Sequence, residues 1–311
     1  MSAEKLTLPA YAKINLGLRV LGRRPDGYHE ISTVFQTVTL HDTLTFETTP
    51  GGRLELACPD PEIPTDETNL VMRAASALRE RFGVATGARV GLGKVIPAGG
   101  GLGGGSSDAA VTLIALATLW GIETDARELA ETGARLGADV PFFLSGGTAL
   151  GTGTGADIRP LADAPKRHLC VVTPGVRVST AEAYKALGVH ALTKEDTAAN
   201  LSVSRTEADF SDSLCDVTSN DFEAVVVRLY PEVGCAREAL KGAGAGRVML
   251  SGSGSSVFGV FDSEAEAARA CGALSEAEGV WKVFACATLS RGEYLAALGR
   301  CAAVLRPGRG A

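Results

Sequence analysis

The residues best suited to chemistry in this sequence are the glycines of GGGLGGG at 99–105. Because glycine has no side chain, successive backbone N–H groups can converge on an anion, and a helix that starts after them would add its positive dipole end. The ligand that fits such a cradle is a phosphate chain. The alternative is a flexible loop in which Ser106 or Ser107 caps the next helix, and the two interpretations are compatible.

Two familiar phosphate-binding patterns fit this run poorly. A Walker loop is excluded because no Gly-Lys-Ser or Gly-Lys-Thr follows the glycines. The dinucleotide pattern Gly99-x-Gly101-x-x-Gly104 is present, with Glu123 about twenty residues later. Pro97, however, separates the preceding strand from the glycines, and Glu123 directly follows the helix instead of ending the next strand. The run therefore predicts a phosphate site of another kind.

Lys13 and Asp139 are the candidates for moving protons and balancing charge near a phosphate. Lys13 and Asn15 stand two residues apart on an expected strand, so their side chains share one face, about 6.6 Å apart. A lysine on a polar strand face is usually solvated, so this pattern leaves its role open. Asp139 precedes the apolar residues 140–143 at the start of an expected helix, where it could cap the helix or act as a base.

Alternating strands and helices must position these residues. Residues 10–20 alternate apolar and polar side chains, which predicts a half-buried strand. Further strands are expected at 31–40, 42–47, 89–96, 168–173, 247–250, 257–261 and 280–289, and helices at 69–82, 109–120, 125–137 and 263–274. A Gly- and Thr-rich bridge at 149–157 precedes a domain boundary near residue 160, and residues 186–215 carry no readable pattern.

Length and composition restrict the class of protein. A chain of 311 residues predicts two domains. The net charge of −6 gives no electrostatic basis for non-specific nucleic-acid binding. The longest uncharged run, 109–122, has 14 residues, fewer than the roughly 18 of a membrane span, and no signal peptide is visible. The seven cysteines lie at least 15 residues apart, which indicates reduced thiols, so we expect a cytoplasmic protein without nucleic-acid or membrane partners.

Five segments resemble the GHMP kinase superfamily, whose members phosphorylate galactose, homoserine, mevalonate and related small molecules. They are AKINL at 12–16, DGYHE at 26–30, PAGGGLGGGSSDAA at 97–110, LGADVPFF at 136–143 and SGSGSSVF at 251–258. The usual superfamily loop, P-x-x-x-G-L-G-S-S-A, is two glycines shorter, and Asp108 stands where a small residue is common. This variant resembles the branch that phosphorylates the 2-hydroxyl of 4-diphosphocytidyl-2-C-methyl-D-erythritol in the non-mevalonate route to isoprenoid precursors.

The resemblance implies an α+β, two-domain GHMP kinase fold. Its N-terminal domain, 1–160, would be like domain 2 of ribosomal protein S5, and its C-terminal domain, 161–311, would be ferredoxin-like. Both substrates would bind in the cleft between the domains. The phosphoryl donor implied is ATP, with Mg²⁺ bridging its phosphates. We predict no protein metal ligand, although Ser107 could offer a hydroxyl, and we expect a monomer or homodimer.

The resemblance also assigns roles to single residues. It makes Lys13 and Asp139 catalytic: Asp139 would orient and deprotonate the hydroxyl, and Lys13 would keep Asp139 ionised and offset developing charge. Tyr28 and Tyr184 would sandwich the cytosine, while His29 and Asn15 would hydrogen-bond the substrate. The positions that match ATP-binding residues of the superfamily are Asn69, Leu70, Lys94, Pro97, Ala98, Gly99, Gly100, Gly101, Leu102, Gly103, Gly104, Gly105, Ser106 and Ser107.

Several of these positions also have plain structural interpretations. Lys94 could be a surface charge, Asn69 and Leu70 the start of a helix, and Tyr28 and His29 packing residues at a strand entrance. Residues 251–256 could close over the phosphates or form a hairpin turn. Two other functions stay open: a GHMP kinase of the mevalonate or homoserine type, which the Tyr28–His29 pair argues against, and a non-catalytic binding protein, expected to have lost Lys13, Asp139 or loop glycines.

Overall fold

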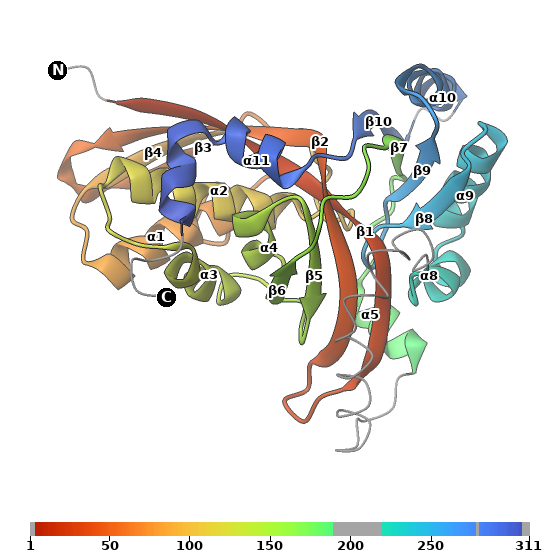
Figure 1. The fold of residues 1–311 in the computed structure, drawn as a ribbon, viewed down its shortest axis with the longest axis horizontal. Coiled ribbons are helices and arrows are strands. Elements are labelled where there is room, and N and C mark those ends of the chain that lie inside the picture. The colour runs from red at the N-terminus through yellow and green to blue at the C-terminus, as the bar shows by residue number, and fades with distance from the viewer. Residues whose placement is uncertain (1–3, 189–218, 278–279, 307–311) are drawn as a thin grey trace.

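Two β-sheets carry the fold of the computed structural model, which describes residues 4–188, 219–277 and 280–306. Figure 1 shows one lobe around each sheet, with the long β1–β2 hairpin running between them. In chain order the elements are β1 (Lys5–Arg23), β2 (His29–Thr49), η1 (Pro50–Gly52), β3 (Leu54–Ala57), α1 (Leu70–Phe82), β4 (Gly87–Gly93), α2 (Gly104–Leu119), α3 (Ala126–Ala134), α4 (Val140–Ser145), β5 (Thr148–Thr152), β6 (Asp157–Pro160), β7 (His168–Thr173), α5 (Thr180–Leu187), α8 (Glu223–Leu229), α9 (Pro231–Gly242), β8 (Arg247–Leu250), β9 (Val257–Phe261), α10 (Glu264–Ala277), β10 (Lys282–Ala287), α11 (Arg291–Ala297) and η2 (Gly299–Leu305).

The first sheet has six strands, in the order β3-β4-β2-β5-β6 with β1 also paired to β2. The two strands expected at 31–40 and 42–47 are one strand of 21 residues, β2. Asp42 lies inside this strand, is fully buried and accepts hydrogen bonds from the backbone of Val95 and Ile96. The bridge expected at 149–157 is also wrong, because β5 and β6 form a hairpin whose turn uses Gly153 and Gly155 at positive φ.

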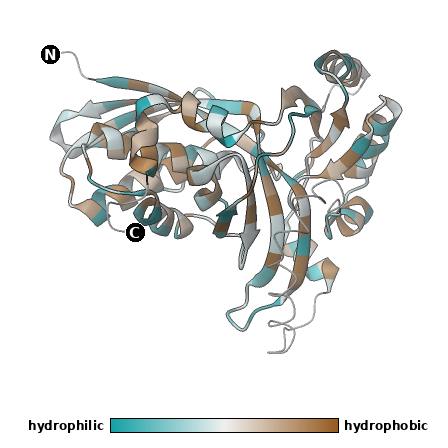
Figure 2. Cartoon of the chain, viewed as in Figure 1, coloured by the Kyte–Doolittle hydropathy of each residue, from teal (hydrophilic) through white to brown (hydrophobic). Residues whose placement is uncertain are grey.

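The helices α1 to α4 accompany this sheet, and α1 and α3 start where a side chain caps them. Asn69 caps α1 by accepting from the amide of Val71, and Asp125 caps α3 by accepting from the amide of Glu128. The apolar run starting at 109 forms α2, the central helix, which is buried from Ser107 to Ala117. Figure 2 shows hydrophobic residues along the strands and helices of both lobes, whereas the turn joining β1 to β2 is hydrophilic.

The helix α2 begins at Gly104, so it includes residues 106–108, which were expected to precede it. Its N-cap is Gly103, whose φ of 70° is in the left-handed region, and Ser106 and Ser107 lie inside the helix. The prediction that either serine caps the helix is therefore wrong. Because the glycine run enters the helix directly, the amides at the amino end of α2 belong to the glycine loop itself.

The second sheet is antiparallel, with strand order β10-β7-β9-β8. Its strands and helices follow one another as expected for a ferredoxin-like domain. The predicted bounds of β7, β8 and β9 are confirmed, while β10 is shorter at both ends than the predicted 280–289. Cys170 and Cys271, distant in sequence, are buried neighbours here, with their Sγ atoms 2.6 Å apart as free thiols.

An apolar layer joins the two lobes. It includes Ile14 and Val38 from the first sheet and Val171 and Phe258 from the second. The chain then returns to the first lobe, since residues 289–301 contribute Leu289, Tyr294, Leu298 and Cys301 to its core. A boundary near residue 160 would fall between β6 and β7 and stays a prediction, but the chain end does not remain with the second sheet.

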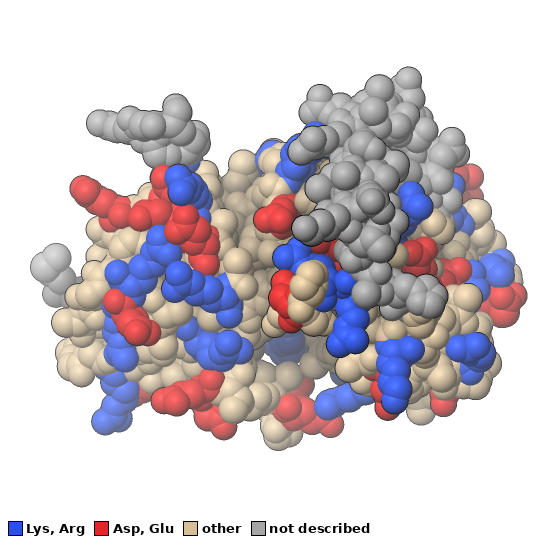
Figure 3. Space-filling view, turned by 90° about the horizontal axis from the view of Figure 1, so that it is seen from below, with Lys and Arg blue, Asp and Glu red and all other residues tan. Residues whose placement is uncertain are grey.

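The length and hydrophobicity of the helices and the charges at the surface are the features relevant to membrane and nucleic-acid binding. No helix among the described residues is long and apolar enough to cross a membrane. On the face drawn in Figure 3, basic and acidic side chains are interspersed across both lobes. Residues 189–218, which include most of the unreadable segment 186–215, lie outside the described residues.

Candidate active site

A cleft of about 750 Å³ lies where the lobes meet. Its walls come from β1, β2, the glycine loop, the segment before α4, α5 and the loop after β8. It brings together many of the predicted site residues, among them Lys13, Asn15, Tyr28, Gly101, Asp139 and Tyr184. Residues distant in the sequence therefore share one cavity.

Lys13 is buried on β1, not solvated on a half-buried strand face as the alternating pattern predicts. Its backbone N–H donates to the carbonyl of Leu102 at 2.9 Å, so the glycine loop lies against this strand. The Lys13 Nζ donates to Asn15 Oδ1 at 2.8 Å, and it lies 5.3 Å from the centroid of the Phe35 ring. A lysine head so far removed from water needs a carboxylate partner.

That partner is Asp139, whose Oδ2 lies 3.5 Å from Lys13 Nζ. Asp139 occupies the N-cap position of α4, yet its side chain makes no capping hydrogen bond with the described residues. The alternative role of helix cap is therefore not realised. The carboxylate, with 30% of its side chain exposed, lines the cleft instead.

The Asn15 amide holds Lys13 in place. Its Nδ2 donates to Thr33 Oγ1 at 2.7 Å, and Thr33 in turn donates to the carbonyl of Gly17 at 2.7 Å. This chain of hydrogen bonds fixes the orientation of the amide, so that its oxygen faces the lysine. Asn15 is 1% exposed, and both ends of its side chain already have partners.

The glycine loop presents amides, because its carbonyl oxygens are already bound elsewhere. Gly99, Gly101 and Gly103 all have positive φ, between 70° and 79°. The carbonyl of Gly100 accepts from the Ser256 amide and that of Gly101 from Ser251 Oγ, each at 3.0 Å. The first amides of α2 have no partner within the helix. A curled backbone that ends in free amides can bind an anion.

The loop after β8 closes one side of this cradle. Besides its bonds to the glycine loop, it places Gly252 and Gly254 in the cleft wall. Asn220 supports it by donating to the carbonyls of Leu250 and Gly252. The structure thus places residues 251–256 beside the glycine loop, and they also form the connection between β8 and β9.

The aromatic residues expected to bind cytosine lie at the other end of the cleft. The rings of His29 and Tyr184 stack, with centroids 4.0 Å apart and planes 12° apart. Tyr28 is 66% exposed at the rim. Tyr184 thus stacks with His29, and the sandwich of a cytosine between Tyr28 and Tyr184 stays a prediction. Burial, with a smaller effect of the Asp139 charge, raises the pKa of Tyr184 to about 12. Burial also lowers the pKa of His29, assisted by Arg23.

The residues expected on the nucleotide side lie on the opposite flank of the glycine loop. Asn69 fills its structural role, since its amide caps α1 and also donates to the carbonyl of Pro64 at 2.7 Å. Lys94 is not a surface charge: only 8% of its side chain is exposed, and it pairs with Asp42 and Asp108. Lys94, Pro97 and Ala98 line a smaller cavity of about 210 Å³.

Sequence reasoning missed several residues that shape the site. In the sequence, Thr33, Phe35 and Asp42 read as ordinary strand residues. Arg135 lines the cleft at the end of α3 without an ion pair to any described carboxylate. Its one signal in the sequence is its place four residues before Asp139. No three His, Cys, Asp or Glu side chains of the described residues converge as metal ligands.

Comparisons with known proteins agree with this geometry. The GHMP kinases N terminal domain matches residues 69–147, and the GHMP kinases C terminal domain matches residues 202–279. A 4-diphosphocytidyl-2-C-methyl-D-erythritol kinase of Prosthecochloris aestuarii is 42% identical over 274 residues, covering 88% of this chain and 94% of the relative. A protein of the same name from Moorella thermoacetica is 42% identical over 277 residues, covering 88% and 96%.

Solved structures show the same relationship. A crystal structure of 4-(cytidine 5'-diphospho)-2C-methyl-D-erythritol kinase matches with a TM-score of 0.74 and 36% identity, covering 91% of this chain and 99% of the other. A homoserine kinase from Cytophaga hutchinsonii shares the fold at a TM-score of 0.63 and 19% identity, covering 91% and 95%. The chain belongs to the GHMP kinases and, within them, to the 4-diphosphocytidyl-2-C-methyl-D-erythritol kinase family.

Proposed function

We propose that this chain is a kinase that transfers the γ-phosphoryl group of ATP to the 2-hydroxyl of 4-diphosphocytidyl-2-C-methyl-D-erythritol. The observation that carries the proposal is the pairing of Lys13 with Asp139 at 3.5 Å in the same cleft as the glycine loop. The names of the relatives support the choice of substrate. The reaction belongs to the non-mevalonate synthesis of isoprenoid precursors.

In the proposed reaction, Asp139 orients the substrate hydroxyl and receives its proton. The hydroxyl oxygen forms a bond to the γ-phosphorus while the bond from that phosphorus to the bridging oxygen breaks, and ADP leaves with the electron pair. A carboxylate is a weak base toward an alcohol, but it can accept the proton late, when the new bond has made the alcohol acidic. Lys13 keeps Asp139 ionised and offsets negative charge on the transferred group.

The glycine loop holds the donor in this proposal. The amides of Gly104, Gly105 and Ser106, at the amino end of α2, bind the phosphates together with the loop that precedes them. Mg²⁺ enters with ATP as part of the substrate and is held mainly by the phosphates. Leu70, Pro97 and Ala98 face the nucleotide, while Asn69 and Lys94 fix the elements that carry them.

The aromatic end of the cleft selects the cytosine. We assign stacking to Tyr28 and Tyr184 and edge hydrogen bonds to His29, whose ring now covers Tyr184. Asn15 acts on the substrate chiefly through Lys13, because its amide already serves Lys13 and Thr33. Arg135, a cation in the cleft wall, suits the diphosphate of the substrate. A cytoplasmic location and a monomer or homodimer stay predictions.

The test is ADP release with a panel of alcohols. The chain is expected to turn over the cytidyl substrate and to leave mevalonate and homoserine unphosphorylated. Turnover of mevalonate or homoserine without turnover of the cytidyl compound would assign the chain to another GHMP activity. Failure of all three, in a folded protein that binds the cytidyl compound, would support a non-catalytic binding protein.

A further inference from the structure

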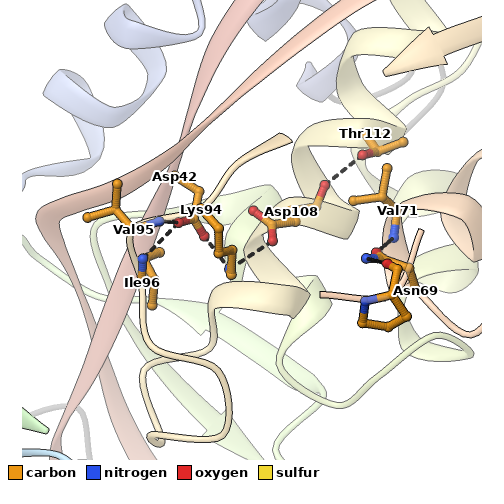
Figure 4. A network of polar contacts seen from close by, with 9 residues as sticks. Asp42, Asn69, Val71, Lys94, Val95, Ile96, Asp108 and Thr112 are labelled. Atoms are coloured by element: carbon orange, nitrogen blue, oxygen red, sulfur yellow. Dashed lines mark hydrogen bonds and ion pairs between the residues drawn. The ribbon is translucent and has the colours of Figure 1, made fainter. Parts of the chain in front are cut away.

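A buried cluster of charges lies beside the amino end of α2. Figure 4 shows Lys94 between two carboxylates, Asp42 from β2 and Asp108 from α2. The exposed fractions of the three side chains are 0% for Asp42, 8% for Lys94 and 4% for Asp108. Two carboxylates and one ammonium leave an uncompensated negative charge if all three are ionised. Such a charge in the interior is costly.

The cluster is tied to the glycine loop through Gly104. A Cβ atom placed on Gly104 would lie 2.8 Å from Lys94 Nζ, so the ammonium lies against the first residue of α2. Asp108 lies one turn further along the same helix. Any ligand that binds the free amides at this helix end therefore comes close to the cluster.

The two carboxylates differ in how well they are satisfied. Asp42 accepts from the amides of Val95 and Ile96, at 2.5 and 2.8 Å, and also from Lys94. Asp108 accepts from Lys94 at 3.0 Å through one oxygen, while its other oxygen, Oδ1, is buried and bonded to no described residue. Asp108 is therefore the member that can carry a proton without breaking a hydrogen bond.

We propose that Asp108 takes up a proton when ATP binds to the glycine loop, with Asp42 and Lys94 as the positioning residues that hold it beside the loop. The inference rests on the proposed function, which places the phosphates at this helix end. Bound phosphates bring negative charge toward the cluster and favour its neutral form. The proton comes from solvent onto Oδ1 and returns when the nucleotide leaves.

The surroundings of the Asp108 carboxyl support this assignment. Burial raises the pKa of Asp108 to about 7, the Asp42 charge adds to the rise, and Lys94 opposes it. Among the described residues, Asp42 and Lys94 are the charged groups that face Asp108 from the neighbouring elements. Near neutral pH the carboxyl is thus partly ionised, and a nearby anion can complete its protonation. Linkage then makes MgATP bind about threefold to tenfold more weakly at pH 8 than at pH 6.

Calorimetry of MgATP binding to the full chain tests the inference. Titrations at pH 7 in two buffers of different ionisation enthalpy give the number of protons taken up for each MgATP bound. We expect less than one proton per MgATP, because part of the Asp108 population is already protonated at this pH. Asp108→Asn is expected to abolish this uptake and to flatten the pH dependence of the affinity. Glu80→Gln is the matched control, since it removes an exposed carboxylate on α1 that lines neither the cleft nor the smaller cavity beside Lys94, and it should leave the uptake unchanged.

The outcomes separate this inference from the proposed function. Wild-type protein that turns over the cytidyl substrate and binds MgATP without proton uptake would overturn the inference alone. Uptake that persists in Asp108→Asn would overturn it as well. A wild-type chain that binds no MgATP would instead remove the proposed function. If Asp108→Asn does not fold, the two-buffer titration of the wild type still shows whether MgATP binding is accompanied by proton uptake, and its absence overturns the inference.

Discussion

The ammonium of Lys13 and the carboxylate of Asp139 lie 3.5 Å apart, although one belongs to the first strand and the other precedes α4. The lysine is nearly inaccessible to water, while the aspartate reaches the cleft with 30% of its side chain exposed. This difference in exposure suits a buried ammonium, that of Lys13, which stabilises the ionised form of a carboxylate, that of Asp139, at the surface of the cleft. It also suggests that the two residues act as a unit.

Asp139→Asn and Lys13→Met should fold and lose turnover. Each removes a group that acts on the transferred proton or charge, so kcat should fall by roughly 10²-fold or more. Steady-state ADP release, with circular dichroism to verify folding, measures the effect. Because the residues act together, the double variant should lose little more than either single one. A kcat near that of the wild type in either single variant would remove the assignment.

Gly101→Ala should weaken MgATP binding more than Gly99→Ala. Both glycines have positive φ, which costs an alanine about 1–2 kcal/mol. A Cβ on Gly101 would also collide with the carbonyl of Ser251, whereas nothing lies within 4 Å of a Cβ on Gly99. Comparing the two variants therefore separates the effect of backbone strain, which both share, from the effect of the collision with Ser251, which only Gly101→Ala causes. Titration calorimetry and thermal unfolding measure both effects, and equal losses in the two variants would contradict the close approach of the two loops.

Local pattern predicted most of the fold. The strands β7 to β9 and the helix α1 are short segments whose alternation or capping residue defines them, and their bounds were predicted to within a residue. The errors came from tertiary context. The burial of Asp42 could not be predicted, because the sequence does not show the backbone amides that donate to its carboxylate. The hairpin β5–β6 looked like a linker because its glycines serve turns and close packing.

The same limit applies to the candidate site. The glycine run, Lys13 and Asp139 could be selected from residue type and resemblance. Sequence could not show that Lys13 is buried, because the groups that cover it come from the glycine loop and from Phe35. Nor could it show that Lys94 pairs with two carboxylates, since they come from β2 and α2. Ion pairs between residues distant in the sequence produce no periodic pattern of residue types from which they could be predicted.

Tyr28→Ala and Tyr184→Ala should raise the KM for the cytidyl substrate and leave the KM for MgATP unchanged. An aromatic pair contributes about 0.5–1.5 kcal/mol beyond the area it buries, so each loss predicts a change of about threefold to tenfold or more. Tyr230→Phe is a suitable control, because it removes only an exposed hydroxyl bonded to Glu182. Initial rates with each substrate varied in turn measure the split. An unchanged cytidyl KM in both variants would place the base elsewhere.

The stability of the protein should fall as the pH rises through the range in which Asp108 ionises. Its pKa of about 7 lies above the value of about 3.9 expected for an unfolded aspartate, so the folded state binds the proton more tightly. The stabilisation is fully present below about pH 4 and is lost between about pH 4 and pH 7. Chemical denaturation across this range measures it.

Asp108→Asn provides the control for that profile. The amide is neutral at every pH and leaves Asp42 and Lys94 as a balanced pair, so the variant should lack this part of the decline. At pH 8 it should be more stable than the wild type by about 1–3 kcal/mol, the cost of an unsatisfied buried group. Below about pH 4, where Asp108 is protonated in both the folded and the unfolded chain, the difference should nearly vanish. A variant less stable than the wild type at pH 8 would show that the Lys94–Asp108 ion pair outweighs the burial of the extra charge.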